Sequence, residues 1–527
     1  MPNDLKNNSF SELTNALLKA FEVKTVIDAD RKISVNILVS RVASWYEKLR
    51  TAMDYGNEET ILRRAIERIL KRRLFMDADP KSLAEDVVRE LVWARYFEDA
   101  TLPESIINEV ASSIKLYLKL KDSVIAKRAI PNDTVYEYII QLLSCEIDYI
   151  LKPNKEKEAM ANFMFRIFRN TVDIVDDSKQ TRDVQVFIAV RKNFARDDIA
   201  FLRYKLFSQI FGRLSEQNLA EVVTNFVKAY NEIKYQLVYP RKDRIFNHVK
   251  KKTPAFLILY DILMSERQRI GILARDGEGL KTKVFADCKQ RYRNIKGKVT
   301  TAIIRSFVFI LFTKAFIALF IEGSFERFFY GQIQWGAMAL NVFVPPLLMV
   351  AAGLWIKTPD ARNSTKILFD IQRLLFEDNP QIVPNLSLKL KPDKTNSVKD
   401  FTFSILWFLS TLLVFGLIVS LLSKLHFNPL SQGIFLFFIA IISFLTYRIY
   451  QTANLYTVVA KQGLLSPIVD FFFVPIIRVG RRFTEGIAQI NFILIIIDFI
   501  IEAPFKGLVG FFEQWFLFLA NKREELE

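Results

Sequence analysis

Two groups of aspartates stand in the first 200 residues at spacings that could hold a metal ion. Asp173, Asp176 and Asp177 fall at i, i+3 and i+4, which would place three carboxylates on one face of a helix. Asp197 and Asp198 form a second acidic group. Converging carboxylates can hold Mg²⁺ for pyrophosphate chemistry. We favour the alternative that these acids are solvated at the ends of helices, with a turn at Asp176–Lys179, and we expect neither an enzyme nor a cofactor.

A lysine stands inside an apolar run that is long enough to cross a membrane. Residues 302–321 are twenty mostly apolar residues, and Lys314 lies near their middle. A lysine at the centre of a membrane helix costs ~2.5–3.5 kcal/mol on insertion scales, so such residues usually face a partner. Asp498 and Glu502, which share one helical stripe in an apolar stretch, are the partners that we consider. The alternative, which we favour, is that the Lys314 ammonium extends to the outer headgroups.

Other segments offer weaker signals of chemistry. The sequence DGEGLKTK at 276–283 lacks the glycine-lysine spacing of a phosphate-binding loop. The basic helix predicted over 63–73 could bind nucleic acid, but the first 200 residues are electrically balanced, and we expect a solvated face and no nucleic acid. The two histidines cannot form a histidine-based metal site. Cys145 and Cys288 are far apart in segments that we place in the cytoplasm, so we expect no disulfide.

The elements that would position these residues are helices. Residues 1–300 alternate amphipathic segments with short polar stretches and show neither strand alternation nor a repeat. The clearest predicted helix has Asn57 as its expected N-cap and an apolar face made by Leu62, Ile66, Ile69 and Leu70. Its arginines are expected on the opposite, solvated face. The sequence therefore predicts a soluble helical domain ahead of the first apolar run.

Four apolar runs predict membrane-spanning helices. They are residues 302–321, 335–356, 401–422 and 430–447. Pro345 and Pro346 fall inside the second run, where they are expected to kink or break the helix. The later apolar stretches at 464–480, 490–505 and 508–520 are short and contain acids or prolines. They could lie in the interface, re-enter the membrane or form a hairpin of spans, and we favour the first two.

The distribution of basic residues predicts how the four apolar runs are oriented across the membrane. Residues 201–300 hold 21 basic and 9 acidic side chains. Loop 357–400 is also basic, whereas the short loops 322–334 and 423–429 contain one basic residue each. Basic loops stay in the cytoplasm, so the N-terminus and loop 357–400 are predicted to be cytoplasmic. Seven basic residues before the first run are candidates for binding anionic headgroups of the inner leaflet: Lys281, Lys283, Lys289, Arg291, Arg293, Lys296 and Lys298.

The sequence thus predicts an all-α protein with a cytoplasmic helical domain followed by a polytopic membrane domain. The expected parts are a soluble helical domain at 1–240, a basic juxtamembrane segment at 241–300, a four-span domain at 301–450 and a membrane-associated region at 451–527. We expect a multi-pass protein of a bacterial plasma membrane. Its preferred function is that of a scaffold or regulator whose cytoplasmic domain binds a protein partner. The alternative is a transporter or channel component with Lys314, Asp498 and Glu502 in its pathway.

Overall fold

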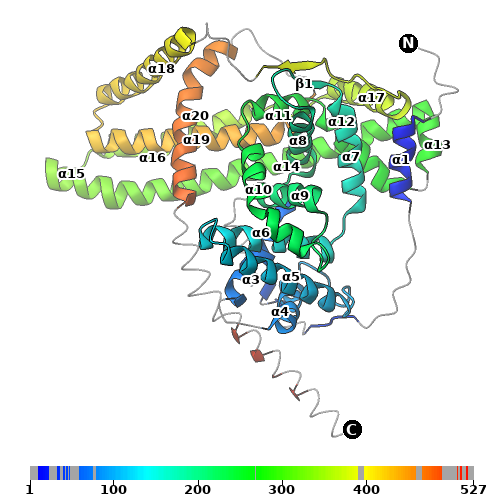
Figure 1. Cartoon of the computed structure of the whole chain (residues 1–527). Coiled ribbons are helices and arrows are strands. Elements are labelled where there is room, and N and C mark those ends of the chain that lie inside the picture. Colours follow the sequence, from blue (N-terminus) through cyan, green and yellow to red (C-terminus); the bar gives the residue numbers. More distant parts are fainter. Residues whose placement is uncertain are drawn as a thin grey trace. The chain divides into compact units, whose positions relative to one another are not determined.

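The computed structural model confirms a helical protein. It describes residues 10–22, 32–35, 40–41, 43–44, 47, 58–74, 79–267, 269–389, 397–458 and 466–489, together with isolated positions between 507 and 519. In this part of the chain helices form nearly all of the regular structure (Figure 1). The chain divides into two compact units. The N-terminal unit comprises residues 10–250, 378–390 and 492–527, and the apolar unit comprises residues 1–9, 251–377 and 391–491.

The N-terminal unit is built from short and medium helices with one pair of strands. Its first elements are α1 (Glu12–Phe21), η2 (Glu58–Thr60), α3 (Ile61–Leu74), α4 (Pro80–Trp93), α5 (Ile106–Ala126), α6 (Asn132–Leu151) and α7 (Lys155–Arg169). They are followed by β1 (Val172–Ile174), α8 (Lys179–Val190), η3 (Arg191–Ala195), α9 (Ile199–Phe211), α10 (Leu219–Leu237), α11 (Lys242–Lys250) and the later strand β2 (Leu386–Leu388). Polar side chains begin several of these helices: the oxygens of Asp79, Asn154 and Ser178 accept from backbone N–H groups in the first turn.

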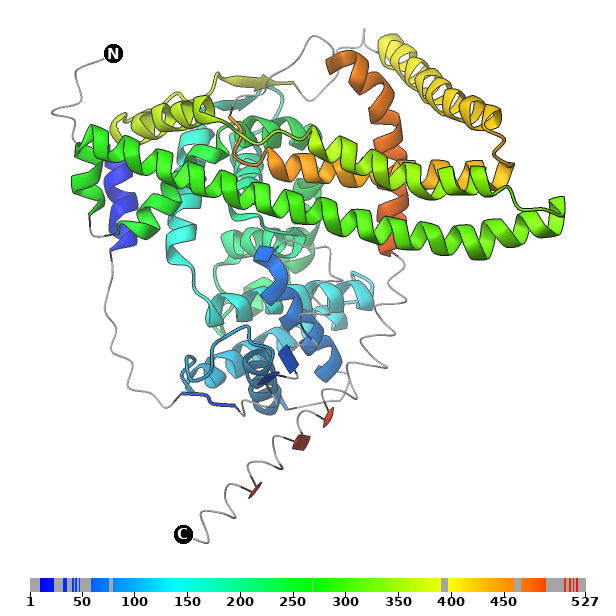
Figure 2. The same cartoon turned by 180° about the vertical axis from the view of Figure 1, so that it is seen from behind.

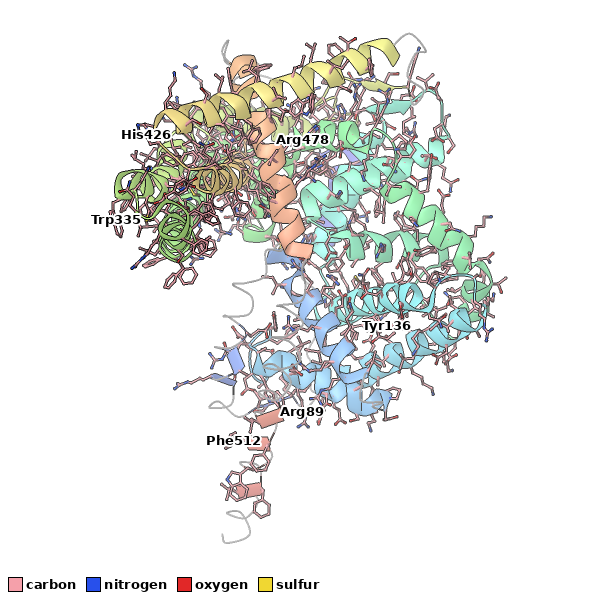
Figure 3. The ribbon with its side chains drawn as sticks, turned by 90° about the vertical axis from the view of Figure 1, so that its left-hand side faces the viewer. Arg89, Tyr136, Trp335, His426, Arg478 and Phe512 are labelled. Carbon is pink, nitrogen blue, oxygen red and sulfur yellow. The ribbon has the colours of Figure 1, made fainter. Side chains whose placement is uncertain are left out.

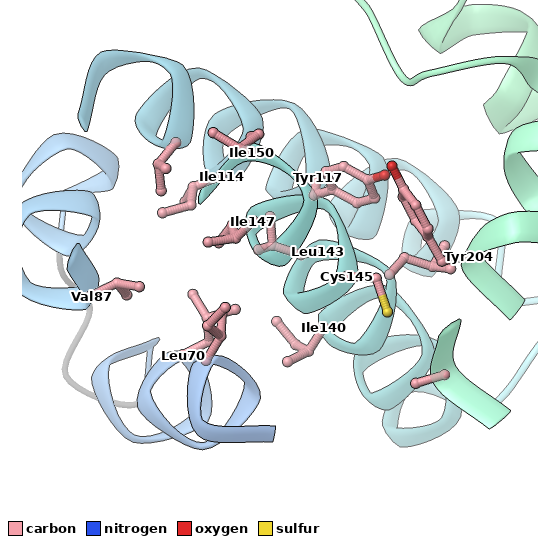
Figure 4. Close-up of a cluster of buried hydrophobic side chains, with 14 of the residues drawn as sticks. Leu70, Val87, Ile114, Tyr117, Ile140, Leu143, Cys145, Ile147, Ile150 and Tyr204 are labelled. Atoms are coloured by element: carbon pink, nitrogen blue, oxygen red, sulfur yellow. The ribbon is translucent and has the colours of Figure 1, made fainter. Parts of the chain in front are cut away.

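Aliphatic side chains from successive helices form the core of the N-terminal unit. Figure 4 shows Leu70 of α3 and Val87 of α4 facing Ile114 of α5 and Leu143 of α6, and all four are fully buried. Ile66 and Ile69 are buried as the helical spacing predicts. Burying such side chains is worth about 1.5–3 kcal/mol each, so this unit has a core of its own.

Two arginines of α3 depart from the prediction of a solvated face. Arg63 is 4% exposed and pairs with Asp198 at 2.8 Å, and it also pairs with Glu67 one turn along. Arg72 is 9% exposed and lies 2.6 Å from the buried Glu90. The prediction was wrong because a basic side chain can enter an interior when a carboxylate of another helix neutralises it, and sequence spacing does not show that partner.

The structure has no helix across the first aspartate group, whereas the turn expected after Asp176 is present. Asp173 lies in β1, which pairs in parallel with β2. Asp176 and Asp177 follow in a turn, where Asp177 accepts from the N–H of Ser178 at 2.6 Å and the hydroxyl of Tyr239 at 2.8 Å. Local sequence could not reveal this strand because its partner lies more than 200 residues later in the chain.

The apolar unit contains four helices that are long and apolar enough to span a membrane. Its elements are α12 (Thr253–Ser265), α13 (Ile270–Arg275), α14 (Gly277–Ile317), η4 (Ala318–Glu322), α15 (Gly323–Tyr330), α16 (Trp335–Leu354), α17 (Ala361–Phe376), α18 (Ser397–Lys424), α19 (Pro429–Ala453) and α20 (Ser466–Gln489). The four spans are the continuous run α14–η4–α15 and helices α16, α18 and α19, which match the four predicted runs. The chain is accordingly an integral membrane protein by the length and composition of its helices.

The outer faces of these helices are apolar. Phe312 is 71% exposed, Leu347 is 58% exposed and Phe408 is 65% exposed. Water would penalise so large an apolar surface, whereas lipid tails accept it. The exposed phenylalanines and leucines thus agree with helices that face a bilayer.

The helix boundaries differ from the predicted ones in three places. The first span extends as a helix from Gly277 to Tyr330, so most of the predicted loop 322–334 is helical. Helix α16 continues through Pro345 and Pro346, which the prediction expected to kink or break it. Residues 466–480 of the short apolar stretch predicted at 464–480 belong to α20, which packs against α19 and α18. The stretch at 490–505 lies outside the described residues.

Helix α14 is the longest element of the described chain and connects two groups of helices within the apolar unit. Its first half packs against α12, α13 and α17, and its second half packs against α16 and α19 (Figure 2). Gly353 of α16 faces the side chain of Ile303 of α14 so closely that a Cβ at this position would overlap it. Small residues at such contacts let helix backbones approach, as membrane helices require.

Candidate functional site in the apolar helices

Lys314 lies in the interior of the apolar unit. It projects from the second half of α14, and its side chain is 0% exposed. Its Nζ stands 4.7 Å from the ring centre of Phe438 on α19, a distance at which the ring face attracts a cation. The ammonium is therefore enclosed by neighbouring helices and does not extend to the headgroups, which corrects the alternative favoured from the sequence.

The acidic partner of Lys314 in the structure is Glu322. The Lys314 Nζ and the Glu322 Oε1 are 3.4 Å apart, and Glu322 is also fully buried. Glu322 Oε2 accepts from Asn341 Nδ2 of α16 at 2.5 Å and from Ser431 Oγ of α19 at 3.1 Å. Three helical segments thus meet at one carboxylate, and opposite charges cancel inside the cluster of Lys314, Glu322, Asn341 and Ser431, which we call the buried cluster.

A π-turn places the two charged residues on the same face. In a regular α-helix the residue two turns after Lys314 would be residue 321, because two turns take about seven residues. Residues Ala318–Glu322 form a π-helical segment, which accommodates one extra residue in a turn. The residue that returns to the face of Lys314 is consequently Glu322, eight positions along.

The buried cluster also contains a polar atom without a hydrogen bond. Asn341 is 0% exposed, and its Oδ1 has no hydrogen-bond partner in the described part of the chain. A buried acceptor left unpaired costs free energy, so such atoms in native proteins call for an explanation. The buried cluster therefore contains one ion pair and one hydrogen-bond acceptor, Asn341 Oδ1, that could accept a further hydrogen bond.

The predicted partners of Lys314 cannot be compared with Glu322, since Asp498 and Glu502 lie outside the described residues. Sequence reasoning missed Glu322 because it assigned this residue to a loop after the first span. One signal was present: Glu322 and Asn341 are polar residues that flank the same short connection, and both lie within a turn or two of a span end. Arg305, on the same helix, is exposed.

The seven headgroup candidates lie in the first half of α14. Lys281 pairs with Glu278 at 3.2 Å, Lys283 with Glu266 at 3.1 Å, and Arg291 with Asp261 at 2.5 Å. The other four, Lys289, Arg293, Lys296 and Lys298, are exposed. Lys289, Arg293 and Lys296 fall at i, i+4 and i+7 and form one basic stripe.

The continuity of α14 bears on which candidates reach lipid. At 1.5 Å per residue, Lys296 lies ~9 Å along the helix from Ala302, where the apolar run begins. Lys281 lies ~32 Å from the same point. A helix that stays straight would therefore bring Lys296 and Lys298 to the headgroups and would leave Lys281 and Lys283 farther into the aqueous phase.

A second polar site lies in the N-terminal unit, at a cavity of about 240 Å³. Four basic and four acidic side chains line it: Lys152, Lys157, Arg191 and Lys205 with Glu59, Asp148, Glu158 and Asp197. Helices α6, α7 and α9 and the π-turn η3 supply most of these residues. We call it the charged cavity.

Arg191 holds one wall of the charged cavity in place. It is 3% exposed and donates to Asp197 Oδ2 at 2.6 Å and to Glu158 Oε2 at 2.8 Å. It begins the π-turn η3, and the next residue after this turn, Arg196, has a left-handed φ of 58°. Burial alone would raise the pKa of Glu158, but Arg191 and Lys205 lower it below its ordinary value. Glu158 thus remains an anion inside the wall.

Asp148 and Cys145 show the opposite effect. Burial raises the pKa of the Asp148 carboxyl to about 7, despite the nearby charges of Lys152 and Arg63. Burial also raises the pKa of the Cys145 thiol, so this cysteine is no nucleophile at neutral pH. Figure 4 shows Cys145 beside Tyr204, whose hydroxyl donates to Glu146 at 2.7 Å. The cavity therefore offers ionic contacts and a carboxyl that titrates near neutrality.

Both aspartates of the second predicted group form ion pairs with arginines. Asp197 pairs with Arg191, and Asp198 pairs with Arg63 while accepting from the N–H of Phe201 at the start of α9. Within the described ranges, no three histidine, cysteine or acidic side chains gather at a spacing that would hold a metal ion. The two cysteines are free.

Comparisons with protein-family models, with curated proteins and with solved structures find no match.

Proposed function

We propose that this multi-pass membrane protein is a membrane-anchored regulator. In this proposal the apolar helices hold the chain in the bilayer, and the N-terminal unit binds a protein partner in the cytoplasm. The observation that carries the proposal is the charged cavity, because it lies in a unit with a hydrophobic core of its own and presents ionic groups that a partner could engage.

The strand pair supports the idea that the N-terminal unit works next to the membrane. Strand β2 belongs to the segment between the second and third spans, and it pairs with β1 of the N-terminal unit at Val172–Leu386, Asp173–Ser387 and Ile174–Leu388. Two paired strands must lie on the same side of a membrane. The pairing agrees with the basic character of both segments, which favours the cytoplasmic side for each.

Two side chains of the charged cavity are the best contacts for a partner. Lys152 is exposed and forms no ion pair in the described part of the chain, and Asp148, one turn earlier, is half-buried without a side-chain hydrogen bond there. Arg191, by contrast, already forms ion pairs with Glu158 and Asp197. A partner that inserts an acidic side chain would meet Lys152 without disturbing the wall.

Chemical cross-linking of the full-length protein in its native membrane tests this proposal. The cross-linked partners of the wild type would be compared with those of Lys152→Glu and of Lys115→Glu, a matched change at an exposed lysine of α5 that does not line the cavity. We expect Lys152→Glu to lose a partner that Lys115→Glu retains. The same set of cross-linked partners in all three proteins would contradict the proposal.

A second candidate function is favoured by the buried cluster. Charged residues within membrane helices often line paths for ions or small solutes, and Lys314 with Glu322 is such a pair. In this alternative the cluster would form part of a transport pathway. Ion flux into proteoliposomes would be measured for the wild type, Lys314→Leu and Arg305→Leu, the last a control at an exposed arginine of the same helix. Flux that survives Lys314→Leu at equal protein abundance excludes this pathway.

A further inference from the structure

A cavity of about 210 Å³ lies at one end of the apolar helices, apart from the charged cavity and the buried cluster. Its walls come from the end of α15, the turn before α16 and the connection between α18 and α19. Figure 3 views the apolar helices from this end, where His426 of that connection and Trp335 at the start of α16 are labelled. This is the end opposite to the basic flanks of the spans, so it faces the outside in the orientation that the basic residues favour.

Glu326 is the one acidic residue among the described residues that line this cavity. It is 4% exposed, and both carboxylate oxygens accept hydrogen bonds. Oε2 accepts from the backbone N–H of Gln334 at 2.8 Å, and Oε1 accepts from Asn428 Nδ2 at 2.6 Å. These donors come from the two chain connections that close the cavity, so Glu326 is held in a fixed position.

The environment of Glu326 differs from that of Glu322, one helical turn earlier. Glu322 has the ammonium of Lys314 as its counter-ion. No lysine, arginine or histidine of the described residues forms an ion pair with Glu326. Neutral donors satisfy both oxygens but bring no positive charge, and a buried carboxylate without a counter-ion is costly. The cavity is thus built around a buried carboxylate that forms no ion pair with a described residue, although the imidazole of His426 lines the same cavity.

The other lining residues indicate which cation would fit. Tyr330 and Phe427 contribute aromatic rings, and Gln332 and Gln334 contribute amide groups. Aromatic faces attract ammonium groups, and amide oxygens accept their hydrogen bonds. A divalent metal ion takes six or more oxygen ligands, and the described lining residues offer one carboxylate, whose two oxygens already accept hydrogen bonds from Gln334 and Asn428. We infer that the cavity binds a small organic ammonium compound, with Glu326 as its counter-ion.

This inference goes beyond the proposed function, since it concerns the opposite end of the spans and does not depend on the charged cavity. A ligand at Glu326 would contact the helix that carries Glu322 one turn away and Lys314 beyond it. Occupancy at the outer end could therefore bias the packing of α14 against α16 and α19.

Binding to the full-length protein in lipid nanodiscs tests the inference. Ethylammonium chloride would be titrated by calorimetry, with sodium chloride at the same ionic strength as the competing cation. We expect saturable binding of ethylammonium, a rise of the thermal midpoint on binding, and at least tenfold weaker binding to Glu326→Gln. Glu278→Gln, a matched change at an exposed glutamate of α14, should bind like the wild type.

Two results would overturn the inference. One is a wild-type protein that shows no saturable binding, or that binds sodium as tightly as ethylammonium. The other is a Glu326→Gln variant with unchanged affinity. If Glu326→Gln does not fold, Tyr330→Leu provides the second test, because Tyr330 is 55% exposed and its loss removes a ring from the wall without burying a new polar group. We expect this variant to bind several-fold more weakly, and unchanged affinity would again overturn the inference.

Discussion

Lys314 and Glu322 stand eight residues apart in one continuous helix, and the π-turn between them brings Nζ and Oε1 to 3.4 Å. Because both charges belong to the same helical run, the run carries its own counter-ion. A helix that is neutral in this way enters a bilayer at a lower cost than one with a lone lysine. The contacts of Glu322 with Asn341 and Ser431 then connect this neutral pair to α16 and α19.

Removing one member of this pair should destabilise the protein strongly. Lys314→Leu leaves the carboxylate of Glu322 buried without a cation, and breaking a buried pair costs about 3–5 kcal/mol. Glu322→Gln leaves the ammonium unpaired and should cost a similar amount. In the double variant both charges are absent, so we expect a loss well below the sum of the two. Thermal unfolding in one detergent measures the stability of the purified wild type, the two single variants and the double variant.

Additive losses in this cycle would show that the two residues do not interact. Arg305→Leu is the control, since it removes an exposed arginine from the same helix. We expect this variant to unfold within a few degrees of the wild type.

The sequence could predict the four spans and the presence of a lysine within the first of them, but not the burial or the partner of that lysine. Apolar length alone identifies a span, and all four runs appear as helices. The partner depends on the π-turn at Ala318–Glu322, which changes the residue that faces Lys314 from position 321 to position 322. No local sequence pattern in this segment predicts the extra residue of the π-turn. The spacing of a regular helix therefore predicts the wrong residue opposite Lys314.

The N-terminal unit shows a related limit. Its buried aliphatic residues follow helical spacing, so Ile66, Ile69 and Leu70 could be assigned to the core. Arg63 could not, because its burial depends on Asp198, which comes 135 residues later. The charged cavity likewise joins residues from distant segments. Helical spacing in the sequence predicts which face of a helix is buried. An ionic site that combines residues from distant segments can be recognised only once the three-dimensional structure is known.

Gly480 provides a test of how α20 packs on α19. A Cβ at this position would overlap the carbonyl oxygen of Ala440, so even Gly480→Ala should force the two helices apart. Gly433→Ala, in α19, is the matched control because nothing lies within 4 Å of its new methyl group. We expect Gly480→Ala to lower the thermal midpoint, whereas Gly433→Ala should leave it unchanged or raise it slightly through helix propensity. Equal midpoints for the two variants would contradict this packing.

Arg191 should matter more to stability than an exposed basic residue in a similar ion pair. Arg191→Met leaves Asp197, 7% exposed, without its cation and leaves Glu158 with Lys205 alone, which we expect to cost about 3–5 kcal/mol. Lys119→Met removes an exposed pair with Glu216 and should cost less than about 1 kcal/mol. Chemical denaturation followed by tryptophan fluorescence in detergent measures both. A small effect of Arg191→Met would show that water reaches the pair.

Asp148 should make stability depend on pH. Its pKa of about 7 in the folded protein exceeds the value of about 3.9 expected for an unfolded aspartate. Between these values the folded state binds a proton that the unfolded state has released, so stability falls as the pH rises from about 4 to about 7.

Replacing Asp148 by asparagine, which does not titrate, should remove this dependence. Asp148→Asn is expected to gain stability relative to the wild type as the pH rises from 5 to 8, by on the order of 1–2 kcal/mol, since a tenfold difference in proton affinity is worth about 1.4 kcal/mol and water screens part of the effect. Thermal midpoints of both proteins at the two pH values test this, with Asp122→Asn on the exposed face of α5 as the control. A difference between wild type and Asp148→Asn that is the same at pH 5 and pH 8 would show that this carboxyl does not titrate in that range.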